Sequence, residues 1–193
     1  MPVLVQSVSS STSSSVGGTP DPQQLMTLLN LASNKSQYDL MLSIEKDGSP
    51  ISGETQRRFA DDKPRMEVEG YLWGVSQRSG GGSAGRQPYT LYIVRRCDAA
   101  TASIMSCLTG ASERMTVTLS AYRAGGDHDL DPVLELTVEN ARLLVHSLLT
   151  GPGDLGPCEV LGFAGRRFEV KSAPQEGSGL RGAVRTCSFE ATT

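Results

Sequence analysis

The chain has 193 residues, a formal net charge of −3 and an isoelectric point of about 5.4. Its 38% hydrophobic and 20% charged residues are typical of a folded globular domain and exclude a disordered polyampholyte or a membrane protein. No apolar run approaches the ~18 residues of a membrane-spanning helix, and the acidic balance argues against a dedicated nucleic-acid binder. The 21 glycines exceed the average share of ~7% and predict many tight turns.

Residues 1–36 differ in composition from the rest of the chain. Residues 6–20 are rich in Ser, Gly and Thr and carry no charge, which is typical of a flexible tail or linker. The first residues lack the basic and long apolar regions of a secretory signal, so we expect no signal-driven export. Within residues 22–31, helical spacing relates Leu25, Met26, Leu28 and Leu29. This amphipathic helix is too short to be stable alone, so we expect it to dock on its own domain or on a neighbour.

From residue 38 onward, alternating apolar and polar side chains predict short strands separated by turns. We expect strands at 38–44, 66–77, 89–94, 115–122, 133–138, 142–149, 159–163 and 167–171. One helix is predicted at 99–108, with Asp98 as its N-cap and Gly110 just past its end. Many short strands and one helix favour a mainly β fold class, an antiparallel β-barrel or sandwich with one flanking α-helix.

Two regions are therefore expected. Residues 1–36 form an N-terminal extension that is rich in Ser and Gly and contains the short amphipathic helix. Residues 37–193 form the β-barrel domain, which is long enough to bury a substantial single core.

Residues 80–85 satisfy the dinucleotide-binding pattern GxGxxG literally. Such a site also needs a helix that opens on the glycines, because the helix N-terminus holds the pyrophosphate. Here Pro88 and an alternating strand follow instead. We interpret the segment as a flexible loop between two strands, a protruding arm that can adapt to a partner.

The cysteines and histidines form no recognisable catalytic or metal-binding motif. Cys97, Cys107, Cys158 and Cys187 lack a CxxC pair or a zinc spacing, and we expect them to be reduced and mostly buried.

Neither histidine has the spacing of a metal site. His128 lies in a polar stretch that we expect to form a hairpin tip, and His146 lies in the predicted strand 142–149. No GxSxG motif supports a serine nucleophile. We therefore expect no enzyme: no catalytic, metal-binding or cofactor-binding residue, and no cofactor. A small hydrolase that uses His128 or His146 is the weakest of the alternatives.

Two further features concern packing. Arginine pairs at 57–58, 95–96 and 166–167 have acidic neighbours, and we interpret them as solvated strand ends, with interface salt bridges as the alternative. Trp73 lies within the predicted strand 66–77 and is expected to pack in the core or between subunits.

The order of the predicted elements, together with two short motifs, resembles a known family. The motifs are Trp73-Gly74-Val75-Ser76-Gln77, which ends the strand 66–77, and Arg123-Ala124-Gly125-Gly126, which follows the strand 115–122. With the Gly-rich loop and the helix 99–108 between them, they resemble the haemolysin-coregulated protein family, the inner-tube protein of bacterial type VI secretion systems. Phage tail-tube proteins are related to this family. The resemblance covers about residues 38–189.

The resemblance implies a structural protein whose hexameric rings stack into a tube inside a contractile sheath and are ejected when the sheath contracts. The implied partners are further copies of the chain, the sheath, the spike and baseplate proteins, and small effectors in the ring lumen. Neither nucleic-acid binding nor membrane insertion is implied. The protein would start in the bacterial cytoplasm and be delivered outside the cell through the apparatus.

The resemblance also points to assembly residues. Ring-to-ring contacts in the family map onto the loop Arg78, Ser79, Gly80, Gly81, Gly82, Ser83, Ala84, Gly85 and Arg86. Further packing or assembly candidates are Trp73, Arg123, Gly125 and Gly126.

Two alternative functions and one departure from the family remain open. The ring could act mainly as a chaperone or carrier for small secreted effectors, or the chain could form the tube of a phage-tail-like contractile particle. Family members usually begin at the strand that corresponds to 38–44. The extension 1–36 could therefore line the lumen, lie on the outer wall or bridge neighbouring subunits.

Overall fold

A computed structural model describes residues 27, 30, 38–55, 59, 61–77, 86–108, 114–123, 132–150, 156–173 and 182–191. These residues are mainly β, which confirms the predicted fold class. In chain order the elements are β1 (Tyr38–Lys46), β2 (Ser49–Ile51), β3 (Met66–Val68), β4 (Gly70–Leu72), β5 (Val75–Gln77), β6 (Arg86–Pro88), β7 (Leu91–Arg96), α2 (Ala100–Ser106), β8 (Met115–Arg123), β9 (Leu134–Thr150), β10 (Pro157–Ala164), β11 (Arg167–Ser172) and β12 (Arg185–Glu190).

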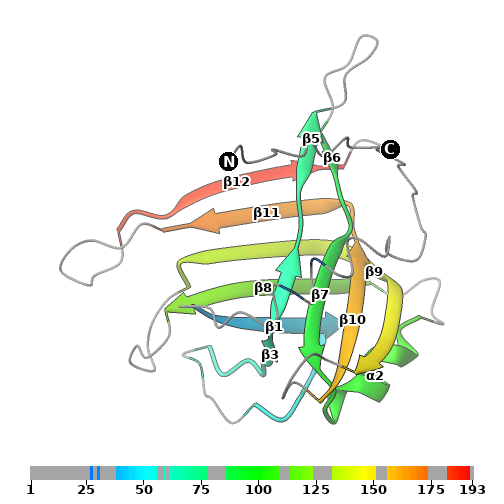
Figure 1. Cartoon of the computed structure of the whole chain (residues 1–193). Coiled ribbons are helices and arrows are strands. Elements are labelled where there is room, and N and C mark those ends of the chain that lie inside the picture. The colour runs from blue at the N-terminus through cyan, green and yellow to red at the C-terminus, as the bar shows by residue number, and fades with distance from the viewer. Residues whose placement is uncertain are drawn as a thin grey trace, which may run out of the picture.

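The main antiparallel sheet closes on itself. Its order is β2-β1-β8-β9-β10-β7-β4, and β3 pairs with β1 on the side away from β8. Between β3 and β4 lies Glu69, whose backbone N–H donates to the carbonyl of Val94 in β7 (2.9 Å). Because β4 pairs with β7 while β3 pairs with β1, this short connection completes a barrel (Figure 1). Closure pairs most strands on both sides, and β12, which pairs only with β11, remains at an edge.

Strand β9 carries the chain from one side of the barrel to the other. Its first half pairs with β8 and β11, and its second half pairs with β10. At the change of partner, Asn140 adopts a left-handed backbone (φ 50°), a conformation that asparagine tolerates better than most residues. The sequence predicted two strands here, 133–138 and 142–149. One bent strand forms instead, because a single left-handed residue turns the strand without ending its hydrogen-bond ladder.

The remaining differences from prediction concern short strands. The predicted strand 66–77 is divided into β3, β4 and β5, and β2, β6 and β12 were not predicted. Pro50 in β2 and Pro88 in β6 argued against strands, yet proline is tolerated in short strands at a sheet edge. In β12 nearly every side chain is exposed, so no alternating pattern marks it.

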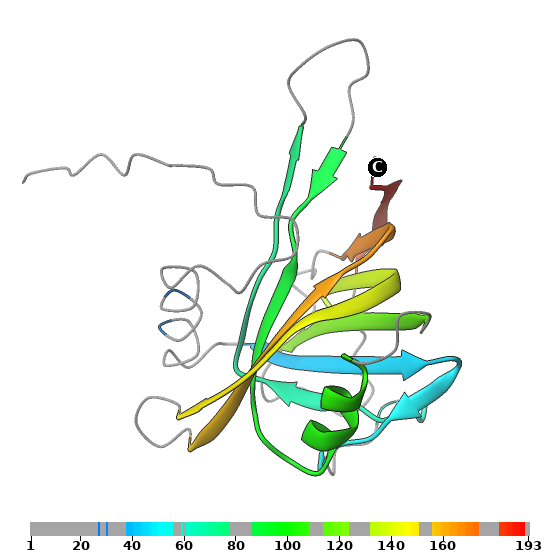
Figure 2. The ribbon, with the colours of Figure 1, turned by 90° about the vertical axis from the view of Figure 1, so that its right-hand side faces the viewer.

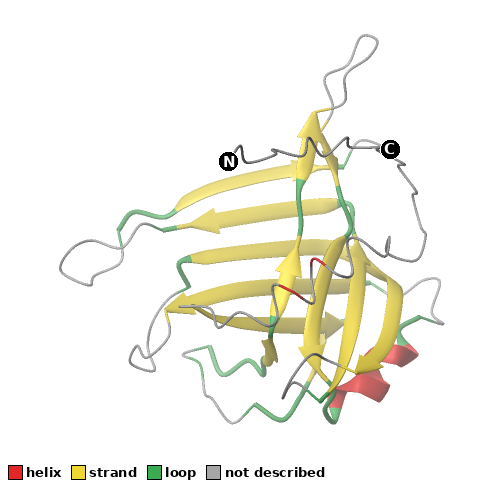
Figure 3. Cartoon of the chain, in the orientation of Figure 1, coloured by secondary structure: helices red, strands yellow, loops and turns green. Residues whose placement is uncertain are grey.

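The main hydrophobic core fills the barrel and extends under the helix. Figure 3 shows α2 beside the strands of the barrel. Helix α2 contributes Ala100 and Ile104, both 1% exposed. The helix begins one residue later than predicted, and its N-cap residue is Ala99 and not Asp98. Asp98 still contributes to this end, because its Oδ1 accepts a hydrogen bond from the N–H of Ala100 (2.8 Å) and its own N–H donates to Oγ1 of Thr101 (3.0 Å). The helix is shorter than the predicted 99–108, because turns follow at Cys107 and Leu108.

None of the four cysteines is in a disulfide. Cys107 and Cys158 are buried as expected, whereas Cys187 is exposed and Cys97 is partly exposed, so the prediction of mostly buried cysteines holds for only two of the four. Burial raises the pKa of the Cys97 thiol above its ordinary value, and the nearby Glu159 carboxylate adds to this effect.

Candidate assembly surfaces

The most prominent surface feature is an arm built from β5 and β6. The two strands pair antiparallel, with Val75 opposite Pro88 and Gln77 opposite Arg86, and they form a sheet separate from the barrel. Figures 1 and 2 show this hairpin projecting away from the barrel in two perpendicular views. The sequence predicted a protruding arm at this place, but it did not predict that paired strands would support it.

The base of the arm is closely packed. The N–H of Tyr89 donates to the carbonyl of Gly74 (2.9 Å), directly before Val75 and after Pro88. A Cβ on Gly74 would lie 3.2 Å from Cδ2 of Tyr89, tighter than an ordinary van der Waals contact, so the strands approach closely because position 74 is glycine. Tyr89 is 53% exposed and therefore lies on the surface beside the arm.

Most of the predicted loop residues lie outside the described part of the chain. This applies to the ring-stacking residues 78–85 and also to Gly125 and Gly126. Arg86, which was predicted to belong to the loop, lies in strand β6, so the loop is one residue shorter than predicted. Arg123 ends β8, where it is exposed and pairs in register with Tyr38 of β1.

Trp73 connects the arm to the rest of the molecule. Its ring stacks on Phe168 of β11 and Phe189 of β12, with centroids 5.7 and 6.4 Å away, and the two phenylalanine rings are 5.4 Å apart. Trp73 is half-buried and packs against the main core. Because it precedes β5 by two residues, this stack fixes the start of the arm against the β11–β12 hairpin.

A network of charged side chains lies at the other end of the barrel, beside α2. Arg95 of β7 contacts Oδ1 of Asp98 (2.5 Å) and Oε1 of Glu159 in β10 (3.0 Å). The second oxygen of Glu159 lies 2.5 Å from Nε2 of His146 in β9. Oγ1 of Thr101 in α2 donates to Oε1 of Glu159 (3.3 Å). The network therefore joins three strands to the helix.

Burial of this network corrects one interpretation made from sequence. Arg95 is 1% exposed, and the side chains of His146 and Glu159 have no exposed surface, so Arg95 does not lie at a solvated strand end. Its neighbour Arg96 is exposed and pairs with Glu69 (2.7 Å), as that interpretation predicted. Successive side chains of a strand point to opposite faces. Arg95 therefore lies on the face of β7 that carries Leu91 and Ile93 toward the core, and Arg96 lies on the opposite face.

The carboxyl of Asp98 responds to two opposing effects. Burial favours its neutral form, but the hydrogen bonds from the Arg95 guanidinium and the Ala100 N–H favour the charged form. Together these hydrogen bonds hold the pKa of Asp98 below its ordinary value of 3.8. The charged carboxylate thus caps α2 and binds Arg95 at the same time.

Sequence analysis missed this network, although a signal was present. Glu159 is the one charged residue in β10, Pro157–Ala164, which is otherwise almost entirely buried. A lone carboxylate in such a strand is rarely buried unless it is paired, so a basic partner on a neighbouring strand could have been sought.

The described residues offer no assembled catalytic or metal site. No cluster of three or more His, Cys, Asp or Glu in this part of the chain could hold a metal ion. His146 is enclosed by the ionic network, which leaves no open side for a substrate, and His128 lies outside the described residues. Within the described residues no helix is long and apolar enough to span a membrane.

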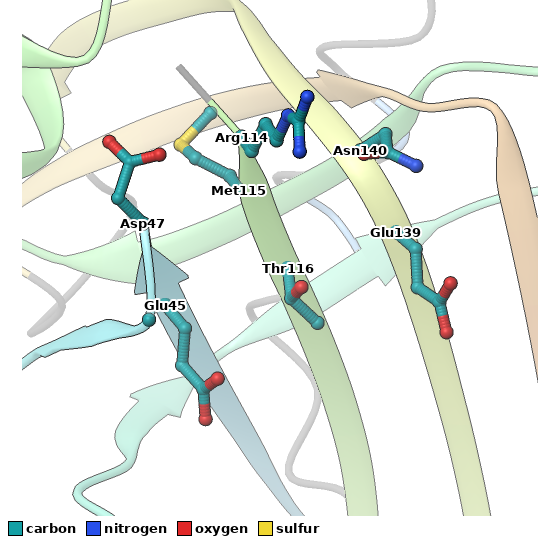
Figure 4. A pocket seen from close by; sticks show the side chains of 8 residues that line it. Glu45, Asp47, Arg114, Met115, Thr116, Glu139 and Asn140 are labelled. Carbon is teal, nitrogen blue, oxygen red and sulfur yellow. The ribbon is translucent and has the colours of Figure 1, made fainter.

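An open depression of about 460 Å³ lies where β1, β8 and β9 run side by side. Figure 4 shows Glu45, Thr116, Glu139 and Asn140 on these three strands, with Asp47 after the end of β1 and Arg114 before the start of β8. Glu45 already pairs with Lys63 (2.7 Å) and Glu139 with Arg167 (3.7 Å). The acidic groups therefore serve surface ion pairs and do not converge on one point, as a catalytic pair must.

Comparisons with known proteins identify a family. A family model described as "Type VI secretion system effector, Hcp" matches residues 42–171. No curated protein is detectably similar in sequence.

Several solved structures share the fold. Hcp1 from Salmonella typhimurium is 18% identical, with 81% of this chain and 96% of that chain covered and a TM-score of 0.63. The secreted protein Hcp3 from Pseudomonas aeruginosa is 16% identical, with 81% and 99% covered and a TM-score of 0.58. For the Hcp1 protein of E. coli EAEC 042 the identity is 10%, the coverage 78% and 98%, and the TM-score 0.59. At these identities the structures establish the fold, and the family model carries the assignment.

Proposed function

The chain belongs to the Hcp family of type VI secretion system proteins, and we propose that its β5–β6 arm makes the contact between stacked rings. As a member of this family it is a secreted structural protein of the inner tube, a subunit that assembles with copies of itself into rings. Its domain for this role is residues 37–193, and it acts without catalysis. The function depends on the shape of self-complementary faces that repeat from ring to ring.

One observation carries the proposal: the arm projects from the barrel on a fixed base. The Trp73 stack and the Gly74–Tyr89 contact hold the base, and the segment between β5 and β6 contains Gly80, Gly81, Gly82 and Gly85. A fixed base sets the direction of the arm, and glycines let its tip fit closely against a neighbouring backbone. An element that must bridge two rings needs both properties.

Other partners follow from a tube of this kind. A sheath around the tube, a spike and baseplate at its end, and small effectors in its lumen are the partners we propose. Such a subunit acts first in the cytoplasm of the producing bacterium and then outside it, after delivery through the apparatus.

The first experiment measures assembly directly. Light scattering on a gel-filtration column, with negative-stain images of the same peak, should give rings of mass 6 × 20.5 = 123 kDa and stacks of such rings. Replacement Gly81→Asp should leave the rings intact but shorten or abolish the stacks, because it places a charge without a partner in the contact with the next ring. The matched control Ser49→Asp places the same charge on the exposed β1–β2 hairpin and should stack as the wild type does.

The outcomes separate the alternatives. Stacks of normal length from Gly81→Asp would show that the arm tip does not form the ring-to-ring contact. Wild-type rings that never stack and purify with a small bound protein would favour the carrier function. A wild type that remains a 20.5 kDa monomer at all concentrations would contradict ring formation by the chain alone.

A further inference from the structure

Apolar side chains cover part of the outer face of the barrel. On β4, β7, β10 and β9 the side chains that point away from the main core form a separate hydrophobic cluster: Val94, Cys158 and Val160, with Leu72, Tyr92 and Leu149 packed against them. Val94, Cys158 and Val160 have no exposed surface. We call these six residues the outer apolar face.

A second outer face shows how such burial normally arises. On β1 and β8, Met41 and Tyr122 also point away from the main core, and Phe59 from the connection between β2 and β3 covers them. The rings of Phe59 and Tyr122 are 5.3 Å apart, and the guanidinium of Arg65 lies 4.3 Å from the centre of the Phe59 ring. A described segment therefore accounts for the burial of this second face.

Within the described residues, no comparable segment covers the outer apolar face. Helix α2 is excluded, because its buried residues Ala100 and Ile104 pack into the main core. The arm is excluded as well, since β5 and β6 form a sheet of their own that projects away from the barrel (Figure 2). Val94, Cys158 and Val160 are fully buried within the single chain, so the cover must come from elsewhere in this chain.

The N-terminal extension contains a segment of suitable chemistry. Thr27 and Asn30 have helical backbones and are exposed. At 100° per residue they lie on one side of a helix, and Leu25, Leu28 and Leu29 fall on the opposite side. If the polar side faces solvent, the leucine side faces inward and needs an apolar surface to contact.

We propose that residues 22–31 lie as an amphipathic helix on the outer apolar face, with the leucines against Val94, Cys158 and Val160. The dimensions agree. Four strands spaced by about 4.8 Å present a face about 14 Å wide, and a helix with its side chains is about 10–12 Å in diameter. The six residues 32–37 between this helix and β1 can span up to about 20–22 Å when extended, which is enough to reach an adjacent face of a small barrel.

This placement has a consequence for assembly. A subunit that covers its own outer apolar face does not offer that face to other copies, so the extension belongs to the folded subunit and does not bridge to a neighbour. Ring formation and stacking must then use other surfaces. The inference is independent of the proposed stacking role of the arm, since docking of residues 22–31 is a property of a single subunit.

Cys158 reports directly on this contact. Its thiol lies in the outer apolar face and is buried, Cys107 is buried in the main core, and Cys187 is exposed. A short pulse of iodoacetamide, followed by peptide mass spectrometry, measures the alkylation rate of each thiol in the full-length chain. Cys187 then serves as the reactive reference and Cys107 as the test that the barrel stays folded.

The decisive variant is Leu25→Asp/Leu28→Asp/Leu29→Asp, and the matched control is Thr27→Asp/Asn30→Asp on the exposed side. We expect the leucine variant to raise the alkylation rate of Cys158 by at least about tenfold while Cys107 stays protected, because only the local contact opens. The control should leave both rates unchanged. If the three aspartates also expose Cys107, the milder Leu28→Ser variant is judged by the same criterion.

Two results would overturn the proposal. One is unchanged protection of Cys158 in a leucine variant whose barrel is folded. The other is wild-type protection of Cys158 that disappears on dilution, since that would show that a second copy covers the face. Both can occur whether or not Gly81→Asp impairs stacking, so this experiment does not depend on the arm.

Discussion

The two ends of the barrel are closed by opposite kinds of chemistry. At the end where the arm begins, Trp73, Phe168 and Phe189 stack with centroids 5.4–6.4 Å apart. At the end beside α2, Arg95, Glu159, His146 and Asp98 form a buried ionic network. Figure 1 shows α2 and the β11–β12 hairpin on opposite sides of the barrel. Packing of aromatic rings holds one end together, and ion pairs and hydrogen bonds with defined geometry hold the other.

This difference determines how each end should respond to change. Substitution of a stacked aromatic residue lowers the free energy of unfolding in proportion to the packing that is removed. A side chain of similar volume and shape can replace the ring at a small cost. A buried ion pair behaves differently, since removing one partner leaves the other charge without compensation. The ionic end should therefore be the more sensitive to single substitutions, even though the pair itself adds little net stability.

The largest effect is expected from Glu159→Ala. This change leaves Arg95 and His146 buried without their shared acceptor and should lower the free energy of unfolding by about 3–5 kcal/mol. Urea denaturation measures this value. The matched control Glu69→Ala breaks the exposed pair with Arg96 and should cost no more than about 1 kcal/mol.

A double replacement sharpens the comparison. The variant Arg95→Met/Glu159→Leu removes both charges of the Arg95–Glu159 pair. It should be more stable than Glu159→Ala alone, because it leaves no buried arginine that has lost one of its two carboxylate partners. If Glu159→Ala costs as little as Glu69→Ala, the network is solvated and its burial does not control stability.

At the aromatic end we expect an intermediate effect. The ring of Phe189 is only partly buried, so Phe189→Ala should cost about 2–3 kcal/mol, below the range for a fully buried phenylalanine. Phe189→Leu keeps most of the volume and should cost less than about 1.5 kcal/mol. If Phe189→Leu lowers the free energy of unfolding as much as Phe189→Ala does, then ring stacking, and not side-chain volume, stabilises this end of the barrel.

A smaller effect is expected from Trp73→Phe. Within the described residues, Nε1 of Trp73 is buried and has no hydrogen-bond partner. This unpaired N–H has a desolvation cost that offsets part of the stability gained from packing the indole ring. Phenylalanine keeps a ring against Phe168 and removes the unpaired donor, and the free energy of unfolding should change by less than about 1 kcal/mol. Thermal unfolding of this variant beside Trp73→Ala measures the difference, and equal losses would show that the full indole area is required.

The two ends also differ in how far sequence could predict them. Alternation identified most strands, and the sequence around Asp98 predicted the start of α2 to within one residue, although the N-cap residue is Ala99 and not Asp98. It predicted that Trp73 packs, but not against which rings, because Phe168 and Phe189 lie far away along the chain and meet it only in the fold. The ionic end could not be assembled from sequence, because Arg95 and Arg96 look alike until β7 is paired and α2 covers one side of it.

Edges and assembly surfaces were the least predictable features. Strands β2 and β6 contain Pro50 and Pro88 and are stabilised by their neighbours and not by their own pattern. Bending of β9 at Asn140 depends on which partner each half finds. The predicted stacking role of residues 78–85 came from resemblance alone, and it stays a prediction until assembly is measured.

The smallest expected effect concerns acid stability at the ionic end. The folded-state pKa of Asp98 is below the unfolded value of 3.8, so the unfolded chain takes up this proton first as the pH falls. The stabilisation from charged Asp98 is therefore complete above the unfolded pKa and is lost as the pH falls through the folded one. Asp98→Asn should lower Tm at pH 6 but narrow the gap between Tm at pH 6 and pH 3. The matched control Asp62→Asn, at an exposed carboxylate, should leave that gap unchanged. An equal gap in Asp98→Asn and the wild type would show that acid acts on this barrel through carboxylates outside the ionic end.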